Sequence, residues 1–165
     1  MNNPTQEKQR VVVRKLVAED LGAVVALDAV ITGRRREQYF QQKLEQAMRD
    51  TGVQLSLAAE AEDRFVGFLL ARVYYGEFGR PEPVAVLDTL GVDTSMRSRG
   101  VGRALLGQLQ TNLHGLGVRT LQTEVSLDAM ELAFFFHHVG FRPASRLCLD
   151  LDLQTAPRME TAASE

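Results

Sequence analysis

The stretch LGVDTSMRSRGVGRALL at residues 90–106 joins the end of an apolar run to the start of an amphipathic helix. Two glycines and three arginines stand where that helix begins: Gly100, Gly102, Arg97, Arg99 and Arg103. Glycine is a poor helix former, so helix propensity does not explain this choice. The N–H groups of a first helical turn lack partners and carry partial positive charge, and glycine lets an anion approach them closely. The stretch predicts a phosphate-binding helix start, with a merely solvated helix start as the alternative.

Two better-known phosphate motifs do not fit these residues. A P-loop ends in Gly-Lys-Ser/Thr, and none stands here. A dinucleotide-binding fingerprint needs a third glycine inside a βαβ unit, whereas Ala104 and two leucines follow Gly102. The phosphate site, if present, belongs to another kind of fold.

Hydrophobic periodicity along the rest of the chain predicts strands alternating irregularly with helices. We expect strands at 11–17, 53–61, 64–75, 84–93, 119–127 and 141–153, and helices at 18–30, 32–50, 101–116 and 128–140. In the terminal strand, alternate leucines share one face with polar residues on the other. This order predicts an α/β (α+β) protein with a mixed sheet and helices on both of its faces.

Composition limits the function classes. The 165 residues suit one domain, which we place at 11–153 between flexible ends at 1–10 and 154–165. A net charge of -2 argues against a nucleic-acid partner, and no apolar run is long enough to span a membrane. Cys148 is the single cysteine, so no disulfide forms within the chain. A cytoplasmic protein is the simplest interpretation.

Residues 90–106 as a whole resemble the acetyl-CoA-binding segment of the GCN5-related N-acetyltransferases, the GNAT superfamily. Arg97, Gly100 and Gly102 match the family's Arg/Gln-x-x-Gly-x-Gly/Ala pattern. A second stretch, ELAFFFHHVGF at 131–141, resembles the family's helix ending in aromatic-x-x-x-Gly-Phe. The resemblance covers residues 11–153. It implies a mixed, mostly antiparallel sheet of six to seven strands splayed at its centre, with about four helices.

The resemblance also implies a cosubstrate, acetyl-CoA, and no metal. Its pantetheine arm would pair with the backbone of Leu90, Gly91 and Val92. Its diphosphate would lie on the helix start, and Phe136 would face CoA. The implied diphosphate residues are Arg97, Ser98, Arg99, Gly100, Val101, Gly102 and Arg103.

Two acids are candidates for the general base that an attacking amine requires. Glu124 matches the glutamate that members acetylating protein N-termini use, although it also suits a solvated strand face. Asp88 stands inside an apolar run, where an unpaired charge is costly. Its alternative role is a structural carboxylate bonded by a nearby loop or by Arg34–Arg36.

One departure from the family pattern affects the proposed chemistry. Many relatives carry a tyrosine general acid where this chain has Phe136, which has no proton to donate. A non-catalytic acyl-CoA sensor or scaffold is therefore the alternative to an N-acetyltransferase. A peptide, a free amino acid and a polyamine all remain open as acceptors, and Arg34–Arg36 would read an acidic one. We also expect a homodimer, because relatives often pair subunits through the last strand.

Overall fold

The computed structural model describes residues 10–49, 55–76, 79 and 81–156. The predicted flexible ends therefore lie largely outside the described residues. The chain divides into two compact units, Met1–Leu127 and Asp128–Glu165, and each is described by itself.

The first unit is built on one five-stranded sheet with the strand order β1-β2-β3-β4-β5. Its strands are β1 (Val11–Lys15), β2 (Leu57–Ala61), β3 (Arg64–Tyr74), β4 (Val84–Val92) and β5 (Thr120–Gln122). The first four pair antiparallel, and β5 pairs parallel to β4. The mixed, mostly antiparallel fold class is confirmed, although the described residues form five strands where six to seven were expected.

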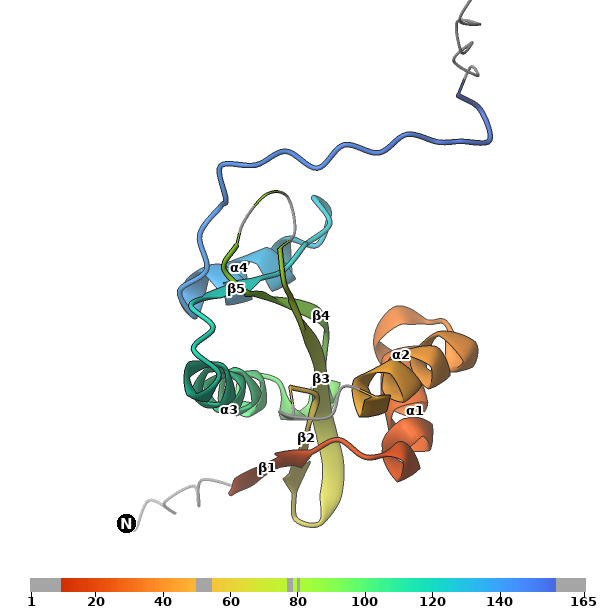
Figure 1. Cartoon of the computed structure of the whole chain (residues 1–165). Coiled ribbons are helices and arrows are strands. Elements are labelled where there is room, and N and C mark those ends of the chain that lie inside the picture. The colour runs from red at the N-terminus through yellow and green to blue at the C-terminus, as the bar shows by residue number, and fades with distance from the viewer. Residues whose placement is uncertain (1–9, 50–54, 77–78, 80, 157–165) are drawn as a thin grey trace, which may run out of the picture. The chain divides into compact units, whose positions relative to one another are not determined.

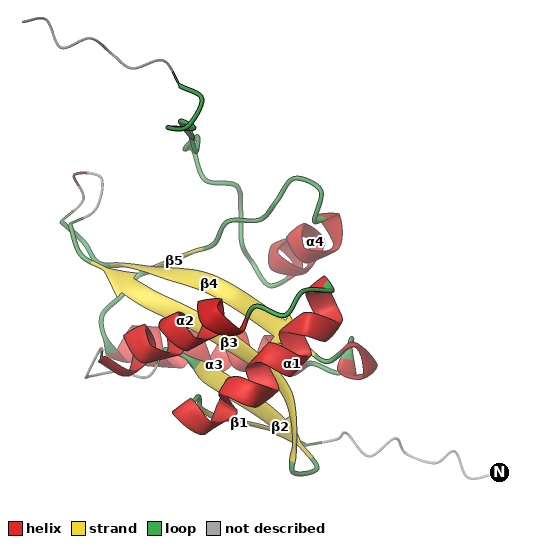
Figure 2. Cartoon of the chain, turned by 90° about the vertical axis from the view of Figure 1, so that its right-hand side faces the viewer, coloured by secondary structure: helices red, strands yellow, loops and turns green. Residues whose placement is uncertain are grey.

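Helices cover both faces of this sheet (Figure 1). The helices α1 (Leu21–Thr32) and α2 (Glu37–Arg49) lie across one face, as Figure 2 shows from that side. The helix α3 (Val101–Gly115) lies on the opposite face. The predicted helix at 32–50 begins later than expected, because Thr32 still belongs to α1 and Gly33 ends that helix with a φ of 71°.

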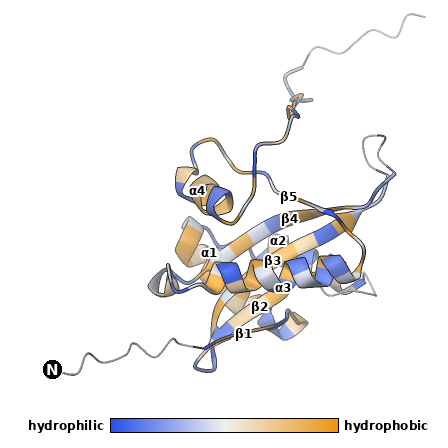
Figure 3. Ribbon diagram, turned by 90° about the vertical axis from the view of Figure 1, so that its left-hand side faces the viewer, coloured by the Kyte–Doolittle hydropathy of each residue, from blue (hydrophilic) through white to orange (hydrophobic). Residues whose placement is uncertain are grey.

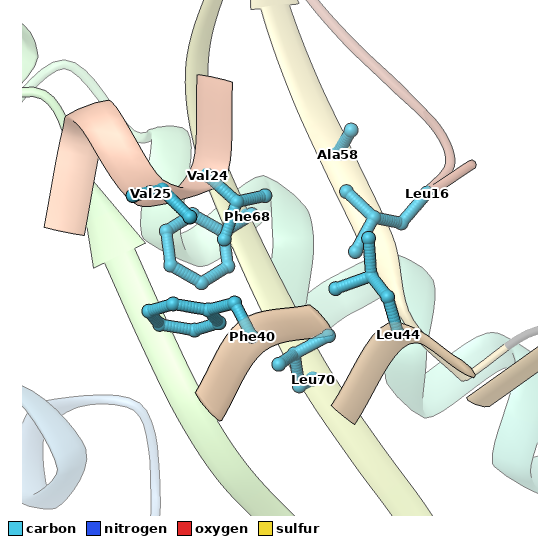
Figure 4. Close-up of a cluster of buried hydrophobic side chains, with 8 residues drawn as sticks. All are labelled: Leu16, Val24, Val25, Phe40, Leu44, Ala58, Phe68 and Leu70. Carbon is cyan, nitrogen blue, oxygen red and sulfur yellow. The ribbon is translucent and has the colours of Figure 1, made fainter. Parts of the chain in front are cut away.

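The core between the sheet and the α1–α2 pair is continuous (Figure 4). Its buried members are Leu16, Val24, Val25, Phe40, Leu44, Ala58, Phe68 and Leu70. The rings of Phe40 and Phe68 meet edge to face with centroids 5.7 Å apart, an arrangement that aromatic pairs favour. This packing fixes α2 over the middle of β3.

The apolar stripe of α3 forms the core on the other face. Val101, Leu105, Leu109 and Leu113 are buried, as their spacing of four residues predicts. Figure 3 views this side and shows α3 with both hydrophilic and hydrophobic bands. The packing holds the first turn of α3, and hence the Gly100–Gly102 segment, against the sheet.

The second unit contains α4 (Met130–His138) and a non-helical segment that reaches residue 156. Our prediction of a terminal strand at 141–153 is wrong, because no residue there is in a strand. Alternation of leucine with polar residues specifies which side chains share a face, but a strand also needs a neighbouring backbone to bond. Among the described residues, none pairs with this segment, and Leu147, Leu149, Leu151 and Leu153 remain exposed.

Candidate active site

The strands β4 and β5 separate near the centre of the sheet. They pair only through Val84–Val86 on β4 and Thr120–Gln122 on β5. The predicted strand at 119–127 is therefore shorter than expected, whereas β4 continues to Val92. From residue 87 onward β4 pairs with β3 alone among the described strands. One edge of β4, over Leu87–Val92, is thus left without a strand neighbour.

A side-chain hydrogen bond marks the point where the two strands separate, which we call the fork. The hydroxyl of Thr123 donates to the carbonyl oxygen of Leu87 at 3.0 Å, one residue beyond the last strand pair. Asp88 follows Leu87 on one limb of the fork, and Glu124 follows Thr123 on the other. The two candidate bases therefore lie one residue beyond this bond, Asp88 on β4 and Glu124 on the segment that follows β5.

Asp88 sits at a β-bulge. The register between β3 and β4 shifts so that Leu70 pairs with Thr89 and Ala71 with Leu87, which leaves Asp88 as the extra residue. A bulge of this kind bends a strand and redirects a side chain, and bulges are common beside active sites. Its position explains how an acid fits into the apolar run of β4.

The Asp88 carboxylate is held by two cations. Its Oδ2 lies 3.0 Å from Lys43 Nζ on α2 and 3.1 Å from Arg72 Nη2 on β3. Arg72 also donates to Gln46 at 2.7 Å. We call Lys43, Arg72, Gln46 and Asp88 the bulge cluster. Sequence reasoning missed Lys43 and Arg72, because their separation from Asp88 along the chain leaves no local pattern.

The expected arginine partners of Asp88 are wrong. Arg36, which lies just before α2, instead donates through Nε to the carboxylate of Asp28 at 2.9 Å. Asp28 is buried on α1, so this bond ties the start of α2 to α1. The hydrogen bond to Asp28 raises the pKa of Arg36, against an opposing effect of burial. Arg35 forms an exposed pair with Glu37, and Arg34 is exposed. Of the three arginines, Arg36 therefore has a structural role.

Glu124 is exposed on the segment that follows β5. Its carboxylate is therefore open to solvent. Asp88 differs from it, because its Oδ2 already binds two cations and its side chain is 16% exposed. Of the two acids, Glu124 has the more accessible carboxylate.

The loop between β4 and α3 is shaped by its own hydrogen bonds. Asp93 accepts hydrogen bonds at 2.8 Å from both the hydroxyl and the N–H of Ser95. These bonds lower the pKa of Asp93, and the bond from the hydroxyl has the larger effect. Ser98 and Gly100 both have a positive φ, of 61° and 85°. Where residues with a left-handed backbone conformation alternate with right-handed ones, successive backbone N–H groups point toward a common spot. Such an arrangement suits an anion.

The helix start has unpaired donors as the sequence predicts. The first intrahelical bond runs from Ala104 N–H to the Gly100 carbonyl oxygen at 2.9 Å. The N–H groups of Val101, Gly102 and Arg103 precede it in the helix and so have no carbonyl one turn back. Gly100 is the N-cap and has no side chain to cap them. These N–H groups, with exposed Arg97, Arg99 and Arg103 around them, are arranged in a way that would suit an anion.

Gly91 has a packing role within the predicted pantetheine strand. A Cβ at this position would lie 2.6 Å from Cε1 of Phe68, which is too close for any side chain. Gly91 therefore lets the ring of Phe68 pack directly against the backbone of β4.

In the second unit, Phe136 is buried and packs on its own neighbours. Its ring centroid lies 4.9 Å from that of Phe141 and 5.5 Å from that of Phe135. His137 and His138 are both exposed. The role of Phe136 beside CoA stays a prediction.

The candidate site presents carboxylates and backbone donors. Over the described ranges, no group of three or more His, Cys, Asp or Glu side chains is arranged to hold a metal ion. Nor does any helix within those ranges have the length and apolar character needed to cross a membrane. An open strand edge, a helix start with N–H groups that lack helical partners and an exposed acid at the fork together suit transfer chemistry on an elongated, phosphate-bearing substrate.

Comparison with known proteins agrees with this geometry. The family model described as "Acetyltransferase (GNAT) family" matches residues 23–141. The [Ribosomal protein bS18]-alanine N-acetyltransferase of Salmonella typhimurium is 32% identical over 91 residues, which are 55% of this chain and 57% of the relative. The chain thus matches a little over half the length of that curated relative.

Solved structures resemble this chain over most of its length. An aminoglycoside N-acetyltransferase in complex with CoA has a TM-score of 0.74 at 19% identity, covering 87% of this chain and 95% of its own. A ribosomal-protein-alanine N-acetyltransferase from Brucella melitensis biovar Abortus 2308 has a TM-score of 0.70 at 17% identity, with 87% and 100% covered. At these identities the likeness concerns the fold alone.

Proposed function

The chain belongs to the acetyltransferase (GNAT) family, and we propose that it transfers an acetyl group from acetyl-CoA directly to a primary amine. The observation that carries this proposal is the unpaired β4 edge at Leu87–Val92, which leads within a few residues to the anion-binding helix start at Gly100–Arg103. Acetyl-CoA has an extended, amide-bearing pantetheine arm that ends in a diphosphate. The arm would suit the strand edge, and the diphosphate would suit the helix start that follows it.

The proposed cosubstrate contacts follow from these two features. The backbone of Leu90, Gly91 and Val92 would pair with the amides of the pantetheine arm, as a neighbouring strand would. The N–H groups of Val101, Gly102 and Arg103 would receive the diphosphate, with charge added by the surrounding arginines. Acetyl-CoA supplies the thioester when bound, and no metal enters the proposal.

Glu124 is the proposed general base. It would take a proton from the acceptor's ammonium group, directly or through a water, before the neutral nitrogen attacks the thioester carbonyl carbon. The carbon–sulfur bond then breaks, the nitrogen releases its second proton to solvent, and an amide and the CoA thiolate result. Phe136 has no proton to give, so the thiolate would be stabilised by backbone donors or protonated from solvent.

Asp88 receives a different role in this proposal. Because its Oδ2 is bonded to Lys43 and Arg72, Asp88 would hold α2 and β3 in place beside the fork. The bulge cluster would then form one wall of the space that the acceptor enters. Glu124 and Asp88 would act as base and positioning residue respectively.

The amine would belong to a protein or peptide N-terminus or to a small molecule. The Salmonella typhimurium relative's name favours the protein N-terminus, since it specifies alanine N-acetylation of a ribosomal protein. A second candidate is a non-catalytic acyl-CoA sensor or scaffold, which Phe136 favours. A cytoplasmic location and a homodimer joined through the C-terminal segment are parts of the same proposal.

The proposal is tested by thiol release from acetyl-CoA in the presence of amines of several classes. The panel contains peptides with different N-terminal residues, free amino acids and polyamines, with Gly102→Glu as a control that cannot hold the diphosphate. An enzyme gives acceptor-dependent thiol release that the control lacks. A sensor binds CoA in calorimetry with the same glycine dependence but releases no thiol with any amine.

A further inference from the structure

The bulge cluster carries more positive than negative charge. Its cations, Lys43 and Arg72, both bind the same oxygen of Asp88, and its fourth member, Gln46, is neutral. All four residues belong to the first unit, on α2, β3 and β4. A single carboxylate therefore serves two cations, which leaves the cluster with an excess of positive charge.

The other acids on the surrounding elements do not offset this excess. Besides Asp88, the elements α1, α2, β3 and β4 contain three acidic residues: Asp28, Glu37 and Glu45. Asp28 binds Arg36, and Glu37 pairs with Arg35. Glu45 is exposed and accepts from Gln41 at 3.2 Å. None of the three forms an ion pair with a cation of the cluster.

The bulge cluster also has more hydrogen-bond donors than acceptors. Lysine and arginine side chains carry several N–H donors and no acceptor. Arg72 donates through Nη1 to Gln46 and reaches Asp88 through Nη2, but its Nε is buried and has no partner among the described residues. Buried donors are nearly always satisfied in folded proteins, because an unpaired one is costly. An anion with several acceptor oxygens would supply what the cluster lacks.

Aromatic rings help to hold both cations in place. Nζ of Lys43 lies 5.5 Å from the ring centroid of Tyr39, and Cζ of Arg72 lies 5.5 Å from that of Tyr74. A cation over a ring face at this distance is attracted by the ring's π electrons. Each cation is thus held by a ring as well as by Asp88. Groups that are already held lose less freedom when a ligand binds, which favours binding.

The bulge cluster lies next to the place where the acetyl group would arrive. In the proposed complex the diphosphate is at the start of α3 and the pantetheine arm runs along Leu90–Val92. The thioester end of the arm would then point back along β4 toward Leu87, whose carbonyl oxygen accepts the bond at the fork. Asp88 is the next residue of β4. An amine that attacks at the fork would bring its nearest substituents to the cluster.

We propose that Lys43 and Arg72 bind a carboxylate of the acceptor, so that the chain selects amines that carry a carboxylate close to the reacting nitrogen. The inference rests on the proposed acetyl transfer and specifies its substrate class. A free α-amino acid and a peptide with an acidic N-terminal residue both supply this chemistry. A polyamine does not, because its additional cations would be repelled by a cluster that is already positive.

Matched acceptors that differ only in one carboxylate test this selection with the full-length chain and acetyl-CoA. Alanine is compared with alaninamide, and a peptide beginning with aspartate is compared with the same peptide beginning with asparagine. In at least one pair, thiol release should give the acid a kcat/KM about tenfold to a hundredfold higher, as expected for a hydrogen bond between charged groups. The pair that shows the preference identifies the source of the carboxylate. No preference in either pair overturns the inference.

Variants of the cluster separate carboxylate binding from a structural role. Lys43→Met and Arg72→Met should each reduce the acid-to-amide ratio of kcat/KM by about tenfold. A structural role alone would lower kcat/KM for both members of a pair and leave their ratio unchanged. Lys15→Met is the matched control, because it removes the same charge from β1, at the far edge of the sheet from β5, and should keep the ratio.

An unchanged ratio in Lys43→Met contradicts the proposed site. This variant decides the matter alone if Arg72→Met does not fold, since it leaves Arg72 to pair with Asp88.

Calorimetry measures carboxylate binding without acetyl transfer. The chain loaded with CoA is titrated with the aspartate and asparagine peptides and with alanine and alaninamide. Tighter binding of an acid without thiol release from any amine overturns the transferase proposal and leaves the carboxylate site standing. Thiol release without any preference for an acid, in rate or in affinity, overturns the carboxylate site alone.

Discussion

The Thr123 hydroxyl donates to the carbonyl oxygen of Leu87 at 3.0 Å, and this bond lies where β4 and the β5 segment begin to separate. It satisfies a carbonyl group that has just lost its strand neighbour. The bond also fixes the starting point of the limb that carries Glu124. The fork is therefore held by a side chain as well as by the strand ladder.

Replacing Thr123 with valine removes this hydroxyl at nearly constant volume. We expect Thr123→Val to lower the free energy of unfolding in urea by about 1 kcal/mol, because the Leu87 carbonyl oxygen loses its donor. Thr123→Ser keeps the hydroxyl and is the matched control, so it should retain more of the stability. Equal stability of the valine variant and the wild type would contradict a role for this bond.

Gly100 and Gly107 provide a matched pair of substitutions on the same helix. An added Cβ would have no atom outside the local backbone within 4 Å at either position, so neither substitution creates a clash. Gly100 has a φ of 85°, and Gly100→Ala should destabilise the protein by about 1–2 kcal/mol through backbone strain. Gly107 lies exposed inside α3, and Gly107→Ala should stabilise it by about 0.5–1 kcal/mol. Thermal unfolding of both variants checks the difference in sign.

Glu124→Gln keeps the shape of the proposed base and removes its basicity. We expect kcat/KM to fall by about 10²–10⁴ and the acid limb of its pH profile to move or vanish, with CoA affinity unchanged. Asp88→Asn is the control and should act mainly on stability, because it leaves Lys43 and Arg72 without their anion. If the asparagine variant loses the acid limb and the glutamine variant does not, the two roles are reversed.

Asp20 makes stability depend on pH. Burial would raise the pKa of its carboxyl, but bonds from Arg14 at 2.7 and 2.8 Å and from the Val17 N–H outweigh burial and lower the pKa below 3.8. A lowered folded-state pKa gives stability that is present above the unfolded pKa and is lost as pH falls through the folded one. Asp20→Asn should therefore cost about 1–3 kcal/mol at pH 7.

The cost of Asp20→Asn should shrink as the pH falls below about 4, where the unfolded chain's carboxyls take up protons. Urea unfolding from pH 7 to pH 3 measures it. Glu37→Gln is the control, because its pair with Arg35 is exposed and contributes at most about 1 kcal/mol at any pH. A cost for Asp20→Asn that does not change with pH would show that the bonds, and not the charge, are what matter.

Local features of the sequence predicted the parts of the structure that depend on local physics. The helix start at Gly100 could be predicted because glycines, arginines and the following apolar stripe all lie within one short stretch. The partners of Asp88 could not, since Lys43 and Arg72 come from distant elements. The prediction of a terminal strand was wrong, because alternating leucines define a shared face but do not supply a neighbouring strand to bond. The assignment of Arg36 failed for the same reason, as Asp28 competes for it from α1.

Amide hydrogen exchange with and without CoA tests the central claim most directly. The claim is that CoA lies along the open edge of β4 with its diphosphate on the start of α3. We predict slower exchange on CoA addition in peptides covering Leu87–Val92 and Ser98–Arg103, with no change in peptides from α2. Gly102→Glu should abolish the protection. Tight CoA binding that leaves exchange in both of these peptides unchanged would contradict the account.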